Sequence, residues 1–206
     1  MNTKRAAPDD RLIDRFIPEP EIRSSHQILV HAPADIVFDV ARDQDLGSHP
    51  IIRGIFRLRE ILLRAKPTAE RRSKGLVADT LALGWGVLAE RPGREVAIGA
   101  VTQPWLPNVT FRAIPADQFV AFNEPDLVKI AWTLEAEPLG PDLTRFRTET
   151  RVLTTDAAAR VKFRRYWNRV GLGVELIRVL TLPMVRREAE RRARRMPEGS
   201  PRWQTR

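Results

Sequence analysis

The sequence contains no cysteine and only three histidines. Without cysteine, disulfide bonds, thiolate nucleophiles and every zinc site that uses sulfur are excluded. The three histidines, His26, His31 and His49, are too far apart for the HExxH pattern of a helical zinc site. The GWG motif, with Gly84 and Gly86, is not followed by the Lys-Ser/Thr pair of a phosphate-binding loop. We therefore expect neither a metal nor a cofactor.

Long apolar runs are also absent. Arginine or glutamate interrupts each apolar stretch well before the roughly 18–20 residues that a membrane-spanning helix needs. The N-terminal segment MNTKRAAPDDRLIDRF has basic residues but lacks the apolar segment of a secretion signal. The sequence therefore predicts a cytoplasmic protein.

Acidic residues are outnumbered, with 26 of them against 35 basic residues and a net charge of +9. More than half of that net charge lies between Arg186 and Arg206, where eight arginines accompany three glutamates. A solvated helix end is the simpler interpretation, because cations near a helix C-terminus are favoured by its dipole. The alternative is docking on an anionic membrane or nucleic acid, with Trp203 as an anchor, although no specific nucleic acid is expected.

The periodicity of apolar residues predicts mixed secondary structure. Alternation indicates strands at residues 25–31, 109–113, 128–136 and 146–152, and a hairpin around the turn Arg91-Pro92-Gly93-Arg94. Helical spacing indicates short helices at 33–42 and from Pro50, followed by a loop at 66–74. A long helix should begin near Ala157, and Gly171, Gly173 and Pro183 should bend or break it. The strand patterns have one apolar and one charged face, which predicts an antiparallel sheet with one side in water.

This order of elements divides the chain into three parts. We expect residues 1–24 to form an extended N-terminal arm, 25–195 a single domain and 196–206 a basic C-terminal tail. The apolar face of such a sheet must be covered by another element. The long amphipathic helix is the only predicted element large enough to cover it.

Two segments resemble a known superfamily. SHQILVHAPADIVFDVAR and KIAWTLEAEP…TRFRTETRVLTTDAAARVKFRRYWNRV are similar to the START-like, or helix-grip, superfamily, also called SRPBCC, and to a polyketide cyclase-like bacterial subfamily of unsettled function. The resemblance implies an α+β fold in which a curved antiparallel sheet wraps around a long C-terminal helix, with two short helices after the first strand. It also implies an apolar cavity between sheet and helix.

The inward-facing residues of such a fold are the candidate ligand site. Aromatic rings would form the walls and hydroxyls would orient a ligand, although the rings would serve equally well as ordinary core. The residues concerned are Trp85, Trp105, Phe111, Trp132, Phe146, Thr148, Thr150, Tyr166 and Trp167.

No catalytic signature is matched, and His49, Tyr166 and Glu149 are the titratable candidates. Glu149 should face outward with Arg147 and Arg151 and pair with Lys129, Thr133 or Glu135. A register slip of one residue would instead turn them into the cavity.

These features predict a protein that carries, sequesters or senses a hydrophobic or aromatic small molecule or lipid in an internal cavity. A polyketide cyclase or dehydratase-like enzyme is the first alternative. An interaction protein that binds anionic membrane or nucleic acid through its basic tail is the second.

Overall fold

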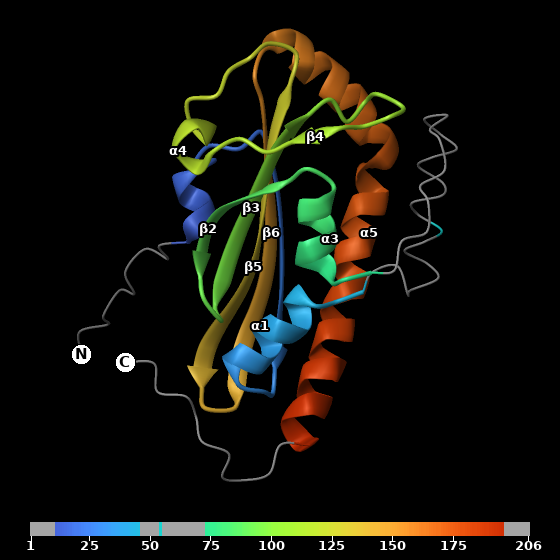
Figure 1. The fold of residues 1–206 in the computed structure, drawn as a ribbon. Coiled ribbons are helices and arrows are strands. Elements are labelled where there is room, and N and C mark those ends of the chain that lie inside the picture. The colour runs from blue at the N-terminus through green and yellow to red at the C-terminus, as the bar shows by residue number, and fades with distance from the viewer. Residues whose placement is uncertain (1–10, 46–53, 55–72, 196–206) are drawn as a thin grey trace, which may run out of the picture.

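The computed structural model describes the fold of residues 11–45, 54 and 73–195 (Figure 1). Its elements, in chain order, are η1 (Leu12–Arg15), β1 (Ile22–Val30), α1 (Ala34–Arg42), α3 (Leu76–Ala82), β2 (Gly86–Arg91), β3 (Glu95–Thr102), β4 (Phe111–Arg112), α4 (Ala116–Phe119), β5 (Val128–Gly140), β6 (Leu143–Thr154) and α5 (Ala157–Arg195).

The strands form one antiparallel sheet in the order β1-β6-β5-β3-β2, with β4 paired to β3. The long helix α5 runs along one face of this sheet, and α1 lies between α5 and one end of the sheet (Figure 1). This arrangement confirms the predicted α+β helix-grip architecture, in which an antiparallel sheet packs around a long C-terminal helix. The hairpin of β2 and β3 around Pro92 and Gly93 and the register of β5 with β6 are as expected.

The inner face of the sheet, which faces α5, carries two apolar clusters. The lower cluster joins α1 and the last turns of α5 to the sheet through buried residues such as Phe38, Leu134, Phe146 and Val185. The upper cluster places Phe163, from the first turns of α5, against the other end of the sheet. Packing at both ends therefore fixes α5 across the sheet.

The outer face of the sheet differs from the expectation of a face in water. Buried residues of the segment that includes η1 pack against the sheet and α4, and they are Leu12, Ile13, Phe16 and Ile17. The ring of Phe16 meets that of Phe119 edge to face, with centroids 6.1 Å apart. The apolar residues of this segment cover part of the charged face, and the covered part is therefore shielded from solvent.

The N-terminal part of the domain is consequently larger than expected. Residues 11–24 do not form a simple extended arm, because η1 packs on the sheet and β1 begins at Ile22. Ile22 to Ser24 pair with Val152 to Thr150 of β6, which extends the strand before the predicted start at Ser25. The helix α3 was not predicted. The expected helix from Pro50, most of the loop at 66–74 and the segment 196–206 lie outside the described residues.

The helix α5 is continuous from Ala157 to Arg195, so its glycines and Pro183 do not break it. Figure 1 shows the helix bending between its first turns and the rest of its length, in line with the other half of that expectation. The indole of Trp167 packs directly over Gly171, where a Cβ atom would lie only 2.9 Å from the ring. Glycine at 171 therefore allows the ring to lie against the helix.

Candidate functional site

Four polar side chains occupy inner-face positions on the neighbouring strands β1 and β6. Ser24 lies opposite Thr150, and His26 lies opposite Thr148. On the other side of β6, Trp132 of β5 pairs with Thr150. Alternate residues of a strand share one face, so all four polar residues point to the same side as Phe146.

The helix α5 contributes a carboxylate to this group. The Ser24 hydroxyl donates to Oε2 of Glu175 at 2.8 Å, and Nε2 of His26 lies 2.7 Å from the same oxygen. We name the resulting set, which joins sheet and helix, the inner polar cluster, and it consists of Ser24, His26, Thr148, Thr150 and Glu175.

The geometry differs from that of a nucleophilic triad. In a triad the imidazole lies between serine and acid and uses a different ring nitrogen for each. Here Glu175 is the shared acceptor, and Nε2 of His26 is the ring atom nearest both Glu175 and, at 3.4 Å, the Ser24 hydroxyl. An ionised carboxylate only accepts hydrogen bonds, so Nε2 of His26 carries hydrogen. The site is thus arranged to orient an imidazole and does not activate the serine.

The cluster retains hydrogen-bonding capacity. Within the described part of the chain, neither Nδ1 of His26 nor the hydroxyl of Thr148 makes a hydrogen bond. The side chains of His26 and Glu175 are 30% and 35% exposed. In the neutral imidazole with hydrogen on Nε2, Nδ1 is an acceptor, and it remains accessible.

The residues predicted to line a ligand site fall into three groups. Trp132, Thr148 and Thr150 lie at the inner polar cluster. Phe146 is fully buried in the lower apolar cluster, so it belongs to the core. The remaining aromatic residues pack elsewhere: Tyr166, Trp167 and Trp105 against the upper cluster, and Trp85 against Phe111 at a centroid distance of 4.9 Å.

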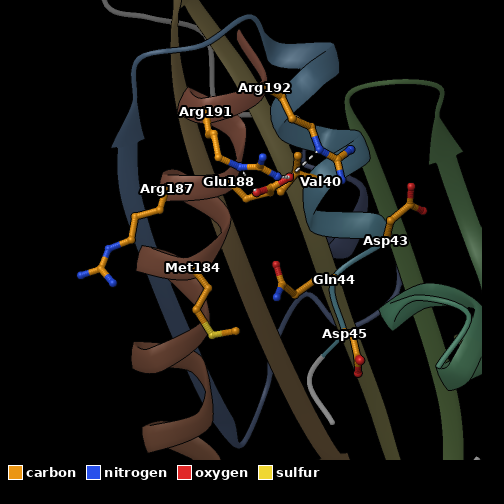
Figure 2. Close-up of a pocket in the computed structure, with 9 residues that line it drawn as sticks. All are labelled: Val40, Asp43, Gln44, Asp45, Met184, Arg187, Glu188, Arg191 and Arg192. Atoms are coloured by element: carbon orange, nitrogen blue, oxygen red, sulfur yellow. Dashed lines mark hydrogen bonds and ion pairs between the residues drawn. The ribbon is translucent and has the colours of Figure 1, made fainter. Parts of the chain in front are cut away.

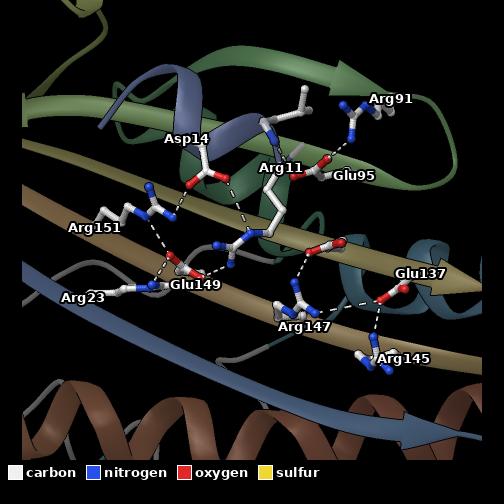
Figure 3. A network of polar contacts seen from close by, with 12 residues as sticks. Arg11, Asp14, Arg23, Arg91, Glu95, Glu137, Arg145, Arg147, Glu149 and Arg151 are labelled. Atoms are coloured by element: carbon white, nitrogen blue, oxygen red, sulfur yellow. Dashed lines mark hydrogen bonds and ion pairs between the residues drawn. The ribbon is translucent and has the colours of Figure 1, made fainter. Parts of the chain in front are cut away.

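The candidate acid Glu149 lies on the outer face, as the predicted register requires, and its side chain is only 1% exposed. Its carboxylate is 2.6 Å from Nε of Arg151, 2.6 Å from Nη1 of Arg11 and 2.8 Å from Nε of Arg23 (Figure 3). Burial alone would raise the pKa of Glu149. Hydrogen bonds from Arg151 and Arg23 and the charge of Arg11 outweigh burial and hold the pKa below its ordinary value of 4.5. Such a saturated carboxylate is unsuited to proton transfer.

The arginines around Glu149 also hold the N-terminal segment. Arg151 donates to the carbonyl oxygen of Ile17 at 2.7 Å and to the carboxylate of Asp14. The buried carboxylate of Glu95 accepts the backbone N–H of Leu12 at 2.9 Å. We call the main group of charges the outer ion-pair network, and it consists of Arg11, Asp14, Arg23, Glu149 and Arg151.

The other expected outward pairs form only in part. Arg147 contacts Glu135 at 3.4 Å, as predicted for neighbouring strands. Lys129 is buried and pairs with no acid among the residues that the structure describes. Its ammonium donates to the carbonyl oxygens of Phe119 and Val120, at the end of α4. Burial lowers the pKa of Lys129.

A surface hollow of about 410 Å³ lies between the end of α1 and the last turns of α5 (Figure 2). Its lining includes Asp43 and Arg187, and its Glu188 is paired with Arg191 and Arg192 at 2.7 and 2.8 Å. This charged hollow does not correspond to the apolar cavity that the family resemblance implies.

The Arg-rich end of α5 is partly neutralised within the helix. Besides the two pairs of Glu188, Arg186 contacts Glu190 at 3.0 Å. These contacts agree with a solvated helix end. Trp203 and the candidate base His49 lie outside the described residues, so contact of the tail with an anionic membrane remains a prediction.

Sequence reasoning did not assign a role to Ser24, His26 or Glu175. A signal for His26 was present, because it shares one face of a strand with the apolar residues Ile28 and Val30. Glu175 is the single acidic residue between Ala157 and Arg187. Together, the single inward-facing histidine of the strand and the single acid of the helix would have indicated the pair.

In the part of the chain that the structure describes, no group of three or more acidic, histidine or cysteine residues is placed to hold a metal ion. The same residues include no helix long and apolar enough to cross a membrane.

No protein-family model matches the sequence, and no curated protein matches it. Solved structures do. The Zhui aromatase/cyclase from Streptomyces sp. R1128 is 16% identical with a TM-score of 0.32, covering 84% of this chain and 96% of that one. A conserved protein from Geobacillus kaustophilus is 10% identical with a TM-score of 0.37, covering 82% and 96%. A START superfamily protein from Mycobacterium smegmatis is 16% identical with a TM-score of 0.28, covering 84% and 97%. At these scores the fold assignment rests on the strand order and α5.

Proposed function

We propose that the protein binds a small, mostly apolar or aromatic molecule between the inner face of its sheet and α5. The ligand carries a hydrogen-bonding group that is recognised by the inner polar cluster. Carriage, sequestration and sensing of such a molecule are all compatible with this site.

The observation that carries the proposal is unused polar capacity on an apolar face. A polar group that is accessible and has no protein partner can bond to a ligand in place of water. His26 offers an acceptor at Nδ1 and Thr148 offers a hydroxyl, and both are inner-face residues. A ligand hydroxyl is the simplest group that would satisfy either one.

The surroundings supply apolar contact. Trp132 and Leu134 lie on the strand next to Thr150 and Thr148, and Ile130 and Val152 continue the same face toward the upper cluster. A pocket suited to small molecules combines mostly apolar walls with a few polar groups that fix orientation. The inner face between the two apolar clusters has this composition.

A matched pair of probes tests the proposal. We expect 1-naphthol to bind about tenfold more tightly than naphthalene, because one hydrogen bond to a partly enclosed acceptor is worth about 1.4 kcal/mol. Titrations of the full chain followed by amide NMR measure both dissociation constants. His26→Phe removes the acceptor and should make the two probes equal.

The chain provides its own control in His31, which also contacts a glutamate of α5, at 3.5 Å, but is exposed. His31→Phe should leave the preference for 1-naphthol intact. Trp132→Ala should weaken both probes. Absence of saturable binding of either probe, together with a clean apo mass in native mass spectrometry, would overturn the proposal.

A catalytic form of the same site is the second candidate, favoured by the pairing of His26 with Glu175. The carboxylate holds hydrogen on Nε2 and leaves Nδ1 as a base, which is the arrangement of an oriented general base. Such a base could remove a proton from carbon next to a ketone carbonyl, the first step of aldol or dehydration chemistry. A cyclase or dehydratase-like activity would follow.

Deuterium exchange tests the catalytic form without knowledge of the natural substrate. The α-protons of 2-tetralone in D₂O are removed by a base and replaced by deuterium, which proton NMR records. A catalytic site predicts exchange faster than that in free imidazole at equal concentration, with loss in His26→Phe and retention in His31→Phe. Equal rates for the native chain and His26→Phe would leave binding as the remaining role.

A further inference from the structure

An exposed row of apolar side chains follows α5 on the side that faces away from the sheet. Leu172, Leu176 and Val179 are 87%, 44% and 52% exposed and follow the i, i+4, i+7 spacing of a single helix face. Pro183, one turn further, is also exposed and extends the row. We call Leu172, Leu176, Val179 and Pro183 the α5 stripe.

Packing on the sheet does not account for the stripe. The side of α5 that meets the sheet uses Phe163, Val170, Leu182 and Val185, all of which are buried. Single exposed apolar residues are ordinary on a protein surface, but a continuous row along one helix marks an interaction surface.

Positive charge borders the stripe at both ends. Arg165 and Arg169 precede Leu172 by seven and three residues, and Arg187 follows Pro183 by four, so they lie along the same side of the helix. All three are exposed, and within the described part of the chain they form no ion pair. Glu175, the single acidic residue between Ala157 and Arg187, is engaged with Ser24 and His26.

The cations nearest the start of the helix behave differently. Arg160 is paired with Glu21 at 2.9 Å, and Lys162 is paired with Asp126 at 2.7 Å. These two cations in the first turns of α5 are therefore neutralised by the body of the protein. Among the described residues, the arginines that flank the stripe have no such partner.

We propose that the α5 stripe docks on the surface of an anionic phospholipid membrane. The leucines and Val179 would enter the boundary between headgroups and acyl chains, and Arg165, Arg169 and Arg187 would contact phosphate groups. Apolar residues bordered by arginine are the pattern of helices that lie in this interface. The charge complementarity between arginines and anionic lipid selects a membrane over an uncharged apolar partner.

Vesicle sedimentation of the full chain tests the docking. We expect binding to phosphatidylcholine vesicles that contain about 30% phosphatidylglycerol, weaker binding to pure phosphatidylcholine, and a decline with added salt. The double variant Leu172→Ser with Leu176→Ser should lower the partition coefficient at least about tenfold. Arg165→Gln and Arg169→Gln should each lower it about fivefold.

A control variant uses exposed leucines away from the stripe. Leu29→Ser with Leu139→Ser changes two residues that are 48% and 41% exposed, and it should leave binding unchanged. Substitutions at such exposed positions change stability little, and circular dichroism verifies the fold of each variant.

Three outcomes would overturn the proposal. The first is equal binding by the native chain and the stripe variant. The second is loss of binding on removal of residues 196–206 with no effect of the stripe variant, which would assign the membrane contact to the tail. The third is stripe-dependent self-association without vesicle binding, which would make the stripe an interface between two copies of the chain. None of these bears on the titrations with 1-naphthol.

Discussion

The two faces of the sheet differ in how completely their polar side chains are paired within the protein. On the outer face, Glu149 receives three arginines and is almost completely enclosed. On the inner face, His26 and Glu175 pair across the gap between strand and helix and remain about one-third exposed. The outer face therefore has many charges with their partners supplied by the protein, and the inner face has few polar groups with capacity left over.

This difference separates structure from function more reliably than the type of residue does. Glu149 is the more polar and more buried group, yet its bonds leave nothing for a ligand. His26 is less conspicuous, but Nδ1 lies on an apolar face where hydrogen bonding is specific. A candidate site is thus better recognised by unused hydrogen-bonding capacity than by charge.

The largest effect is expected from Glu149→Gln. Removing one partner from a buried ion pair leaves the others uncompensated and costs about 3–5 kcal/mol of unfolding free energy. Urea denaturation at pH 7 measures the loss. Glu137→Gln is the control, because Glu137 pairs with Arg145 on the same face but is 35% exposed, and its loss should cost at most about 1 kcal/mol. Equal effects of the two variants would remove the contrast between buried and exposed pairs.

The contribution of Glu149 should also depend on pH. Its pKa in the folded protein lies below the value of the unfolded chain, so its stabilisation is fully present above the unfolded pKa near 4.5 and declines as pH falls through the folded pKa. The difference in unfolding free energy between the native chain and Glu149→Gln should therefore shrink below pH 4.5. Urea denaturation over a series of pH values measures it, and a difference that stays constant would contradict the depressed pKa.

A somewhat smaller loss is expected from Ile17→Ala. Ile17 is fully buried in the cluster that joins the N-terminal segment to the outer face, and such truncations cost about 2–4 kcal/mol. Leu29→Ala, at an exposed position of β1, is the matched control and should cost less than about 0.5 kcal/mol. Thermal unfolding of both variants compares them. A neutral Ile17→Ala would mean that the segment contributes little to stability.

Much of the fold follows from local patterns in the sequence. Strict alternation in 128–136 and 146–152 determines β5 and β6, and the Pro-Gly turn determines the hairpin of β2 and β3. Helical spacing after Ala157 determines α5. These signals are local, so each element can be predicted without knowing which other elements it packs against.

The outer face was predicted less well, because its cover is not local. Leu12, Ile13, Phe16 and Ile17 are four apolar residues in a charged, proline-containing segment, and their pattern alone indicates an arm. Their burial depends on Arg151 and Glu95, which lie more than 80 residues away and bond to the backbone of that segment. Contacts between residues so far apart produce no periodic pattern in the sequence, so the pattern could not predict them.

The inner polar cluster was missed for a related reason. The serine and histidine of β1 and the glutamate of α5 are about 150 residues apart, and neither element is unusual by itself. Thr148, Thr150 and Trp132 were identified correctly as inner-face residues, since strand alternation alone decides this. The carboxylate that completes the cluster required the position of the helix relative to the sheet.

The smallest effect on stability is expected from Glu175→Gln. Glu175 and His26 are partly exposed, so their contact should contribute no more than about 1 kcal/mol to unfolding, against 3–5 kcal/mol for Glu149. Glu190→Gln is the matched control, because Glu190 also lies on α5 and contacts a histidine, His31. Urea denaturation should find the two variants similar, whereas only Glu175→Gln should reduce the preference for 1-naphthol over naphthalene. If Glu175→Gln instead destabilised the fold as strongly as Glu149→Gln, the inner polar cluster would be part of the framework, and the distinction between the two faces would disappear.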